Sequence, residues 1–183
     1  MKVKRNVIEM KINLEKNKLK KPEKAFTIIE LIVVMVILVI AALVAVPMFS
    51  SAADMQLSSA ANMIAADLEY AKNLAIARQQ NHSVVFDTTN NAYHVEVTGG
   101  AVIAHPVNPG DLSVSFPTNS SLSQVTIVST DFNNDTITFN YLGSPFSGSG
   151  TGTPLNSGQI NLQAGTFTMT VSVEPVTGYV TIQ

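Results

Sequence analysis

The chain has 183 residues, a formal net charge of −2 and no cysteine. This length fits one domain with an anchor better than two domains, and the lack of cysteine excludes cysteine metal sites and cysteine nucleophiles. The charge is unevenly distributed, because residues 1–25 hold nine cations against three acids (+6), whereas residues 26–183 hold two cations against ten acids (−8).

Residues 1–25 form a basic leader that precedes an apolar run. The 23 residues from Leu31 to Ala53 carry no charged side chain, and a helix needs about 20 apolar residues to cross the bilayer core. A basic segment beside such a span stays in the cytoplasm. We therefore predict a transmembrane helix over residues 26–53 with a cytoplasmic N-terminus. A nucleic-acid-binding arm is the competing interpretation of the leader.

Glu30, at the start of the apolar run, is the residue that a plain membrane anchor does not explain. An ionised carboxylate inside a membrane costs on the order of 3 kcal/mol, and it is tolerated when it finds a partner. An ordinary secretory signal, cut after Ser51-Ala52-Ala53, is a second alternative. Such signals have an apolar core of only about 7–15 residues, and they also leave Glu30 unexplained.

The run FTIIELI at residues 26–32, together with the leader, closely resembles the processing signal of type IV prepilins and type II secretion pseudopilins. The resemblance implies that prepilin peptidase cuts between Ala25 and Phe26 and that the new Phe26 amine is methylated. It also implies that Glu30 pairs with this cationic amine during filament assembly. The family usually has Gly where this chain has Ala25.

The remaining helical region shows two features. Pro47 lacks an N–H group and predicts a kink. Beyond it, one apolar stripe at helical spacing predicts an amphipathic helix over residues 54–81, ending near Asn81. The stripe consists of Leu57, Ala61, Ile64, Leu68, Ala71 and Ala75.

From residue 82 onward, alternating β-branched and apolar residues predict a β-rich domain. Turn signals separate eight predicted strands, at residues 83–88, 92–97, 112–116, 124–130, 136–141, 159–164, 167–174 and 178–182. The Gly- and Ser-rich stretch 143–158 predicts a flexible loop.

This layout also resembles the GspH/FimT-type minor pseudopilins, a branch of the pilin-like proteins. The segments that carry the resemblance are AANMIAADLEYAKNLAIARQQN at residues 60–81, ITF at 137–139, INL at 160–162, VSV at 171–173 and TGYV at 177–180. The family often closes with Thr-Gly-Arg, and this chain has Tyr179 at the position of the Arg.

Two groups of polar residues are candidates for sites. Asp131, Asn133 and Asp135 have the spacing of a calcium loop, but the Gly and Glu that complete such a loop are missing, so we predict a hairpin turn. A weak calcium site of another geometry, with oxygen ligands, is the alternative. His82, His94 and His105 lie on separate segments and predict scattered surface or half-buried histidines, with no metal site. No nucleophile motif or phosphate loop is present, and we predict neither catalysis nor a cofactor.

Nucleic-acid binding is not expected either. Lys72 and Arg78 are the only cations after residue 25, and affinity for nucleic acids depends mainly on Lys and Arg that neutralise phosphates. The Tyr179 substitution points the same way, because FimT-like members of the branch can bind DNA during uptake.

The predicted fold class is α+β, with a long N-terminal transmembrane helix packed on a C-terminal antiparallel β-sheet or β-sandwich. Its parts are a cleaved leader (1–25), a filament-core helix (26–53), an amphipathic helix (54–81) and a globular domain (82–183). The resemblance implies a minor pseudopilin of a type II secretion pseudopilus, in the inner membrane with a periplasmic domain. Implied partners are other pilins, prepilin peptidase, the inner-membrane assembly platform and the lipid bilayer. The alternative is a FimT-like minor pilin in pilus assembly, DNA uptake or adhesion.

Overall fold

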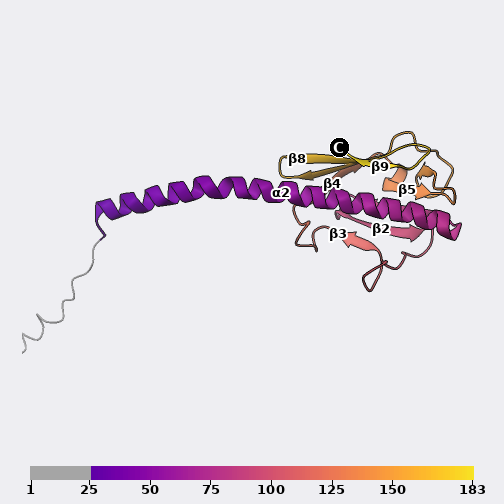
Figure 1. Cartoon of the computed structure of the whole chain (residues 1–183), viewed down its shortest axis with the longest axis horizontal. Coiled ribbons are helices and arrows are strands. Elements are labelled where there is room, and N and C mark those ends of the chain that lie inside the picture. Colours follow the sequence, from indigo (N-terminus) through magenta and orange to yellow (C-terminus); the bar gives the residue numbers. More distant parts are fainter. Residues whose placement is uncertain (1–25) are drawn as a thin grey trace, which may run out of the picture. The chain divides into compact units, whose positions relative to one another are not determined.

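The computed structural model describes residues 26–183, except for the side chains of residues 44–51. The chain divides into two compact units, Met1–Ala45 and Val46–Gln183, and each is described by itself. Helix α2 (Ile28–Arg78) contributes to both units (Figure 1). The predicted leader with Ala25 lies outside the described residues. Pro47 lies within α2, whose main chain is described there as helix, and the kink at this position stays a prediction.

In the C-terminal unit, one stripe of α2 forms the centre of the hydrophobic core. All six residues of the predicted stripe are buried, with at most 1% of their surface exposed. Two further core positions of α2, Ala53 and Ala60, are also alanines. Because Ala has no side chain beyond Cβ, these positions let the helix backbone approach the strands closely.

Helix α2 ends at Arg78, three residues before the predicted stop. Gln79 adopts a left-handed conformation with φ of 54°, and the Gln80 N–H donates to the Ala75 carbonyl oxygen at 3.3 Å. This is a Schellman-type cap, which closes the helix and turns the chain toward the first strand. A Gln in the position usually held by Gly gave no stop signal in the sequence.

The rest of the C-terminal unit consists of two antiparallel sheets with a short 3-10 helix between them. The five-stranded sheet has the order β3-β2-β1-β5-β6 and the four-stranded sheet the order β4-β7-β8-β9. In Figure 1, strands of both sheets flank the C-terminal half of α2. The elements are β1 (His82–Asp87), β2 (Ala92–Val97), β3 (Ser113–Ser115), β4 (Val125–Thr130), η1 (Asn133–Asp135), β5 (Thr136–Phe139), β6 (Pro145–Ser147), β7 (Gln159–Ala164), β8 (Phe167–Val173) and β9 (Val180–Ile182).

All eight predicted strands are present, with ends that differ by at most two residues. The prediction of a flexible loop over residues 143–158 was wrong in part, because this stretch contains β6. The main chain of this stretch is paired: Ser147 N–H donates to the Thr153 carbonyl at 2.9 Å, and Leu155 is buried. Composition alone could not reveal this strand, since its pairing partner β5 lies on a separate segment.

The prediction of a hairpin at residues 131–135 was also wrong. These residues connect β4 of one sheet to β5 of the other, so they form a crossover between sheets. Asn134 and Asp135 adopt left-handed conformations, and the Thr130 hydroxyl donates to Asp135 Oδ1 at 2.6 Å. A local turn signal identifies the change of direction but not the sheet that the next strand joins.

Candidate functional site

The N-terminal unit begins with a helix cap that the sequence analysis did not single out. The Glu30 N–H donates to both the carbonyl oxygen (3.1 Å) and the hydroxyl (3.3 Å) of Thr27. Thr27 therefore caps α2, and Glu30 stands at the third helical position, which is the Thr-x-x-Glu pattern of a capping box. The negative charge of Glu30 also lies where the helix dipole favours an anion.

Phe26, Glu30, Leu31 and Val34 line an open hollow of about 300 Å³ at this end of the helix. Glu30 and Leu31 lie four and three positions before Val34, so these three side chains share one side of the first turns of α2. Phe26 is 77% exposed. The salt bridges of the described residues join Lys72 to Glu69 and His94 to Glu96, so Glu30 has no ionic partner among them.

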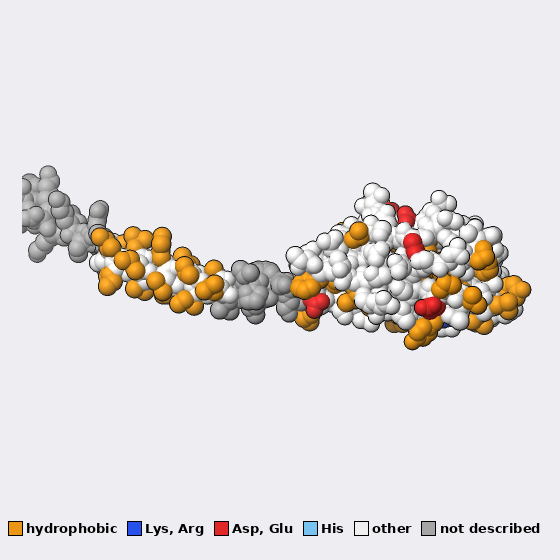
Figure 2. All heavy atoms as spheres, turned by 90° about the horizontal axis from the view of Figure 1, so that it is seen from above, with side chains coloured by type: hydrophobic (Ala, Val, Ile, Leu, Met, Phe, Trp, Pro, Cys, Tyr) orange, Lys and Arg blue, Asp and Glu red, His pale blue; other side chains and the backbone are white. Residues whose placement is uncertain are grey.

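The large apolar side chains of this unit are exposed throughout. From Ile28 to Leu43 their exposed fractions run from 47% at Val34 to 80% at Ile28, and Figure 2 shows hydrophobic side chains covering this segment. Such a surface is far more apolar than that of a soluble monomer and calls for a covering of other chains or lipid. In the part of the chain that the structure describes, no helix meets the length and hydropathy required of a membrane span.

In the C-terminal unit, Lys72 has a structural role that the sequence did not indicate. Its ammonium group lies 2.7 Å from Glu69 Oε2 and donates to the Gly178 carbonyl oxygen at 2.9 Å. The side chain is only 14% exposed. Lys72 thus ties α2 to the turn before β9, a partner 106 residues away in the chain.

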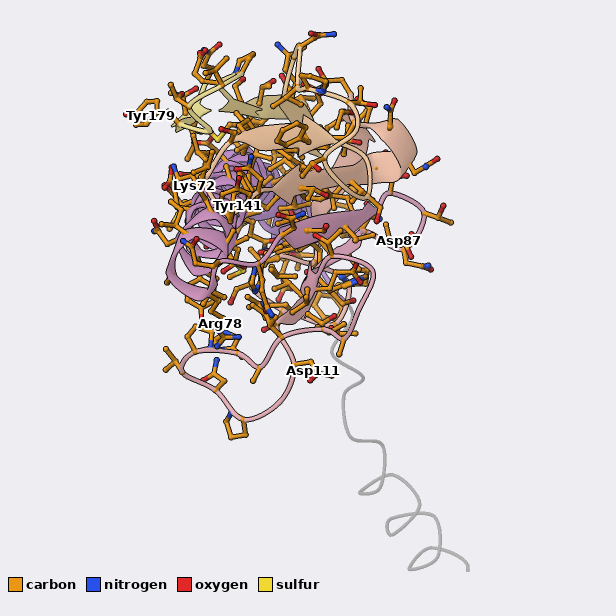
Figure 3. All side chains as sticks on the ribbon, turned by 90° about the vertical axis from the view of Figure 1, so that its right-hand side faces the viewer. Lys72, Arg78, Asp87, Asp111, Tyr141 and Tyr179 are labelled. Atoms are coloured by element: carbon orange, nitrogen blue, oxygen red, sulfur yellow. The ribbon has the colours of Figure 1, made fainter. Side chains whose placement is uncertain are left out.

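This arrangement leaves Arg78 as the exposed one of the two cations beyond residue 25. Figure 3 looks onto the end of α2 and shows Arg78 at the edge of the unit, with Lys72 closer to Tyr141. Nine acids accompany these two cations from Asp54 onward. The cationic surface needed to neutralise several neighbouring phosphates is therefore not assembled here.

We expect a fragment of residues 54–183 to show no measurable DNA binding at physiological salt. Each phosphate contact adds about 0.9 to the log–log salt slope on duplex DNA, and one exposed cation supplies at most one such contact. Fluorescence anisotropy with labelled duplex and single-stranded DNA measures this. The variant Tyr179→Arg, which places a cation where the family often has one, serves as the comparison. Tight, salt-sensitive binding by the unmodified fragment would contradict the expectation.

The three histidines are dispersed, but they are not all at the surface. His82 is fully buried, which corrects the prediction for this residue: its Nδ1 lies 3.0 Å from the Gln80 carbonyl, and its Nε2 has no partner among the described residues. His94 lies 3.6 Å from Glu96. His105 Nδ1 accepts from the Asn108 N–H at 3.0 Å. Within residues 26–183, no three His, Asp or Glu side chains come together as a metal site.

Asp67 and Tyr93 form a partly buried pair that joins α2 to β2. The Tyr93 hydroxyl donates to Asp67 Oδ2 at 2.6 Å. Burial raises the pKa of the Asp67 carboxyl, although the Tyr93 hydrogen bond and the nearby His105 act in the opposite direction. Burial and the Asp67 charge raise the pKa of Tyr93 well above its ordinary value.

This pair predicts an unusual pH dependence of stability. Because the pKa of Asp67 is raised in the folded state, the folded protein holds this proton more tightly than the unfolded chain. The resulting stabilisation is present at pH below 3.8, the ordinary value, and is lost as the pH rises through the folded-state value. In urea titrations, wild type should therefore gain stability relative to Asp67→Asn as the pH falls from 7 to 4.

Asp87→Asn is the matched control, because hydrogen bonds from Asn90 lower the pKa of the Asp87 carboxyl. The stabilisation from Asp87 is present at pH above 3.8 and is lost as the pH falls through the folded-state value. From pH 7 to 4 the difference between wild type and this variant should therefore stay nearly constant, and it should shrink only below pH 3.8. Parallel curves for the two variants would show that burial of Asp67 is not the cause.

Two family models match the chain, one at its N-terminal end and one over the region that follows. A family model described as the prokaryotic N-terminal methylation motif matches residues 20–46, and a model described as type II transport protein GspH matches residues 60–178. No curated protein sequence matches the chain.

Two solved structures of the type IV minor pilin FimU from Pseudomonas aeruginosa strain PAO1 are similar to the chain. The P65 crystal form shares 17% identity at a TM-score of 0.49, covering 69% of this chain and 92% of FimU. The P21 form shares 18% identity at a TM-score of 0.47, covering 69% and 86%.

Proposed function

Since the chain belongs to the family of the type II transport protein GspH, we propose that it is a minor pseudopilin of a type II secretion pseudopilus. The observation that carries the proposal is the order of two matches in one chain: a methylation motif at residues 20–46, followed by a GspH domain at residues 60–178. The first belongs to subunits whose N-terminal helix is processed and assembled. The second is named for type II transport.

The mechanism is assembly, without catalysis. Prepilin peptidase cuts between Ala25 and Phe26, and the apolar helix holds the protein in the inner membrane with its globular domain in the periplasm. The assembly platform then moves the helix from the lipid into a filament with other pseudopilins. The exposed apolar side chains between Ile28 and Leu43 support this sequence of events, because lipid and neighbouring helices can cover the same surface in turn.

Glu30 sets the position of each N-terminal helix relative to its neighbours in the filament. An α-amine is mostly protonated at neutral pH, and its methylation keeps the charge. In the processed chain this cation stands four positions before Glu30, in the hollow that both residues line. A carboxylate that finds a cationic amine on its own or a neighbouring subunit is tolerated in an apolar surrounding, and one that finds none is not.

Processing is the first expected result. Mass spectrometry of protein extracted from membranes should find a chain that begins at Phe26 and carries one N-terminal methyl group. Ala25→Gly, which restores the residue usual in the family, should be cut at least as completely, whereas Ala25→Leu should retain the leader because a large side chain replaces a small one at the cleavage site. An intact leader in the unmodified protein, or a chain starting at Asp54, would contradict the proposal.

The experiment that separates the two pilin-like functions is deletion of the gene, with complementation by the wild type. Loss of secreted enzymes from the culture medium, with surface pili and DNA uptake unchanged, supports the secretion pseudopilus. Loss of pili, adhesion or DNA uptake with normal secretion would move the assignment to a FimT-like minor pilin.

A further inference from the structure

The last strand of the four-stranded sheet presents an unpaired edge. Thr170 and Gln183 exchange two main-chain hydrogen bonds of 2.9 Å, and the Glu174 N–H donates to the Tyr179 carbonyl at 2.8 Å. In an antiparallel ladder the bonded pairs alternate with non-bonded ones, so Val180 and Ile182 direct their N–H and C=O groups away from β8. β9 is the last strand of its sheet, and among the described residues no hydrogen bond reaches these groups.

The edge at β4, on the other side of the same sheet, is blocked by side chains. The Gln124 N–H donates to Gln56 Oε1 at 3.0 Å, and the Ile127 N–H donates to Asn91 Oδ1 at 2.9 Å. A register irregularity between Ile127 and Ser129 further interrupts this strand. Capped donors and bulges of this kind are the usual means by which an edge is closed to other chains.

The edge at β6, in the five-stranded sheet, is closed in a second way. The strand begins at Pro145, which has no N–H to offer. The following loop folds back onto it: the Ser147 N–H donates to the Thr153 carbonyl at 2.9 Å, and Phe146 and Pro154 form an isolated bridge. β9 has neither a proline nor a charged residue between Tyr179 and Gln183.

Exposed apolar side chains surround the open edge. Of the nine large apolar side chains exposed between residues 52 and 183, six belong to this end of the unit: Ile76, Tyr141, Leu142, Val176, Tyr179 and Ile182. The two turns that carry Tyr141 and Tyr179 touch, since a Cβ at Gly178 would lie 2.9 Å from the Gly143 carbonyl oxygen. Figure 3 shows both tyrosines and Lys72 at this end. Apolar groups concentrated here mark a contact surface.

We propose that this surface, the outer edge of β9 with the six apolar residues around it, binds an extended, apolar and non-acidic segment of another protein, which adds a fifth strand to the four-stranded sheet. Main-chain bonds to Val180 and Ile182 supply the pairing, and contacts with the exposed apolar side chains favour β-branched or aromatic residues. This contact lies outside the N-terminal helix, so it goes beyond the proposed function and does not depend on it.

Charge argues against a second copy of this chain as the occupant. From Asp54 onward nine acids face two cations, or −7, and Lys72, the cation nearest the edge, is already paired with Glu69. Glu174 lies next to the edge and is exposed. Two copies would therefore repel each other, whereas a segment with neutral or cationic flanks would be attracted.

The test uses the full chain in detergent micelles and a synthetic peptide with three Val-Thr repeats flanked by Lys. Hydrogen exchange read by NMR reports each amide of β9. In the free protein, Val180 and Ile182 should exchange faster than Thr181, which faces β8. With peptide at about ten times its Kd, exchange at Val180 and Ile182 should slow about tenfold, because a paired amide exchanges only from the unbound fraction.

Two matched pairs make the test decisive. A peptide methylated on alternate backbone nitrogens should not bind, and one with Glu in place of the flanking Lys should bind more weakly. Ile182→Pro removes one outward N–H and should abolish binding, whereas Ile182→Val keeps it and should bind normally. The proposal would be overturned if the methylated peptide bound as well as the first peptide, if Ile182→Pro bound the first peptide as well as the wild type does, or if the first peptide did not bind at all. Protection of β9 that rises with protein concentration in the absence of peptide would also overturn it, and would indicate that two copies of the chain pair with each other.

Discussion

Glu30→Val should reduce incorporation of the protein into filaments by a factor of about a hundred or more while leaving membrane insertion intact. Breaking a buried ion pair costs about 3–5 kcal/mol, and each 1.4 kcal/mol corresponds to a factor of ten in an equilibrium. Insertion should not suffer, because replacing a carboxylate with Val removes an unfavourable transfer into lipid. Quantitative immunoblots of sheared filaments and of the membrane fraction measure the two quantities separately.

The control for this experiment is Glu30→Gln, which keeps the size and polarity of the side chain but removes its charge. If the charge pair sets the register, Gln should reduce incorporation nearly as much as Val. Incorporation of the Gln variant at the wild-type level would show that assembly depends on hydrogen bonding at the first helical turn, where Thr27 caps the helix, and not on the charge of Glu30. Incorporation of the Val variant equal to the wild type would count against a role for Glu30 in assembly.

Gly178→Ala should lower the free energy of unfolding of the globular unit by about 2–5 kcal/mol. Gly178 has a φ of 62°, and a Cβ there would lie 2.9 Å from the Gly143 carbonyl oxygen and 3.2 Å from Lys72 Cδ. The left-handed conformation alone costs a residue with a Cβ about 1–2 kcal/mol, and overpacking adds about 1–3 kcal/mol. Urea unfolding followed by circular dichroism gives the value.

Gly165→Ala isolates the steric part of this loss. Gly165 has nearly the same φ, 60°, but a Cβ there would meet nothing within 4 Å. Gly165→Ala should therefore lower the free energy of unfolding by only about 1–2 kcal/mol, the cost of the left-handed conformation for a residue with a Cβ. Equal losses for the two variants would mean that the contact between the turns at Gly143 and Gly178 adds nothing to stability.

Features that depend on local periodicity could be predicted from the sequence. The stripe that includes Leu57, Ile64 and Leu68 is buried as its spacing indicated, because a helix repeats its faces every 3.6 residues whatever it packs against. The eight predicted strands are present for a similar reason, since alternation with period two follows from the backbone itself.

Features that depend on distant partners could not be predicted. β6 is hidden in a Gly- and Ser-rich segment because its pairing comes from β5 and from Thr153. The Lys72 ammonium bonds to Gly178, far along the chain, so no local pattern signals that this cation is unavailable to ligands. His82 is fully buried, although histidine has only an intermediate tendency to be buried. At the N-terminal end, the Thr-x-x-Glu spacing of Thr27 and Glu30 was a local signal that could have identified the cap.

The bond between Lys72 and Gly178 also has a mechanical consequence. Tension applied along α2 enters the β-structure through the packed core, through the Asp67–Tyr93 hydrogen bond and through the short connection from Gln79 to β1. The Lys72 ammonium adds a further route, because it holds the turn that leads directly into β9. Load on the helix is thus shared with the four-stranded sheet, whose last strand, β9, follows this turn. Such a cross-link suits a subunit that a motor pulls by its helix.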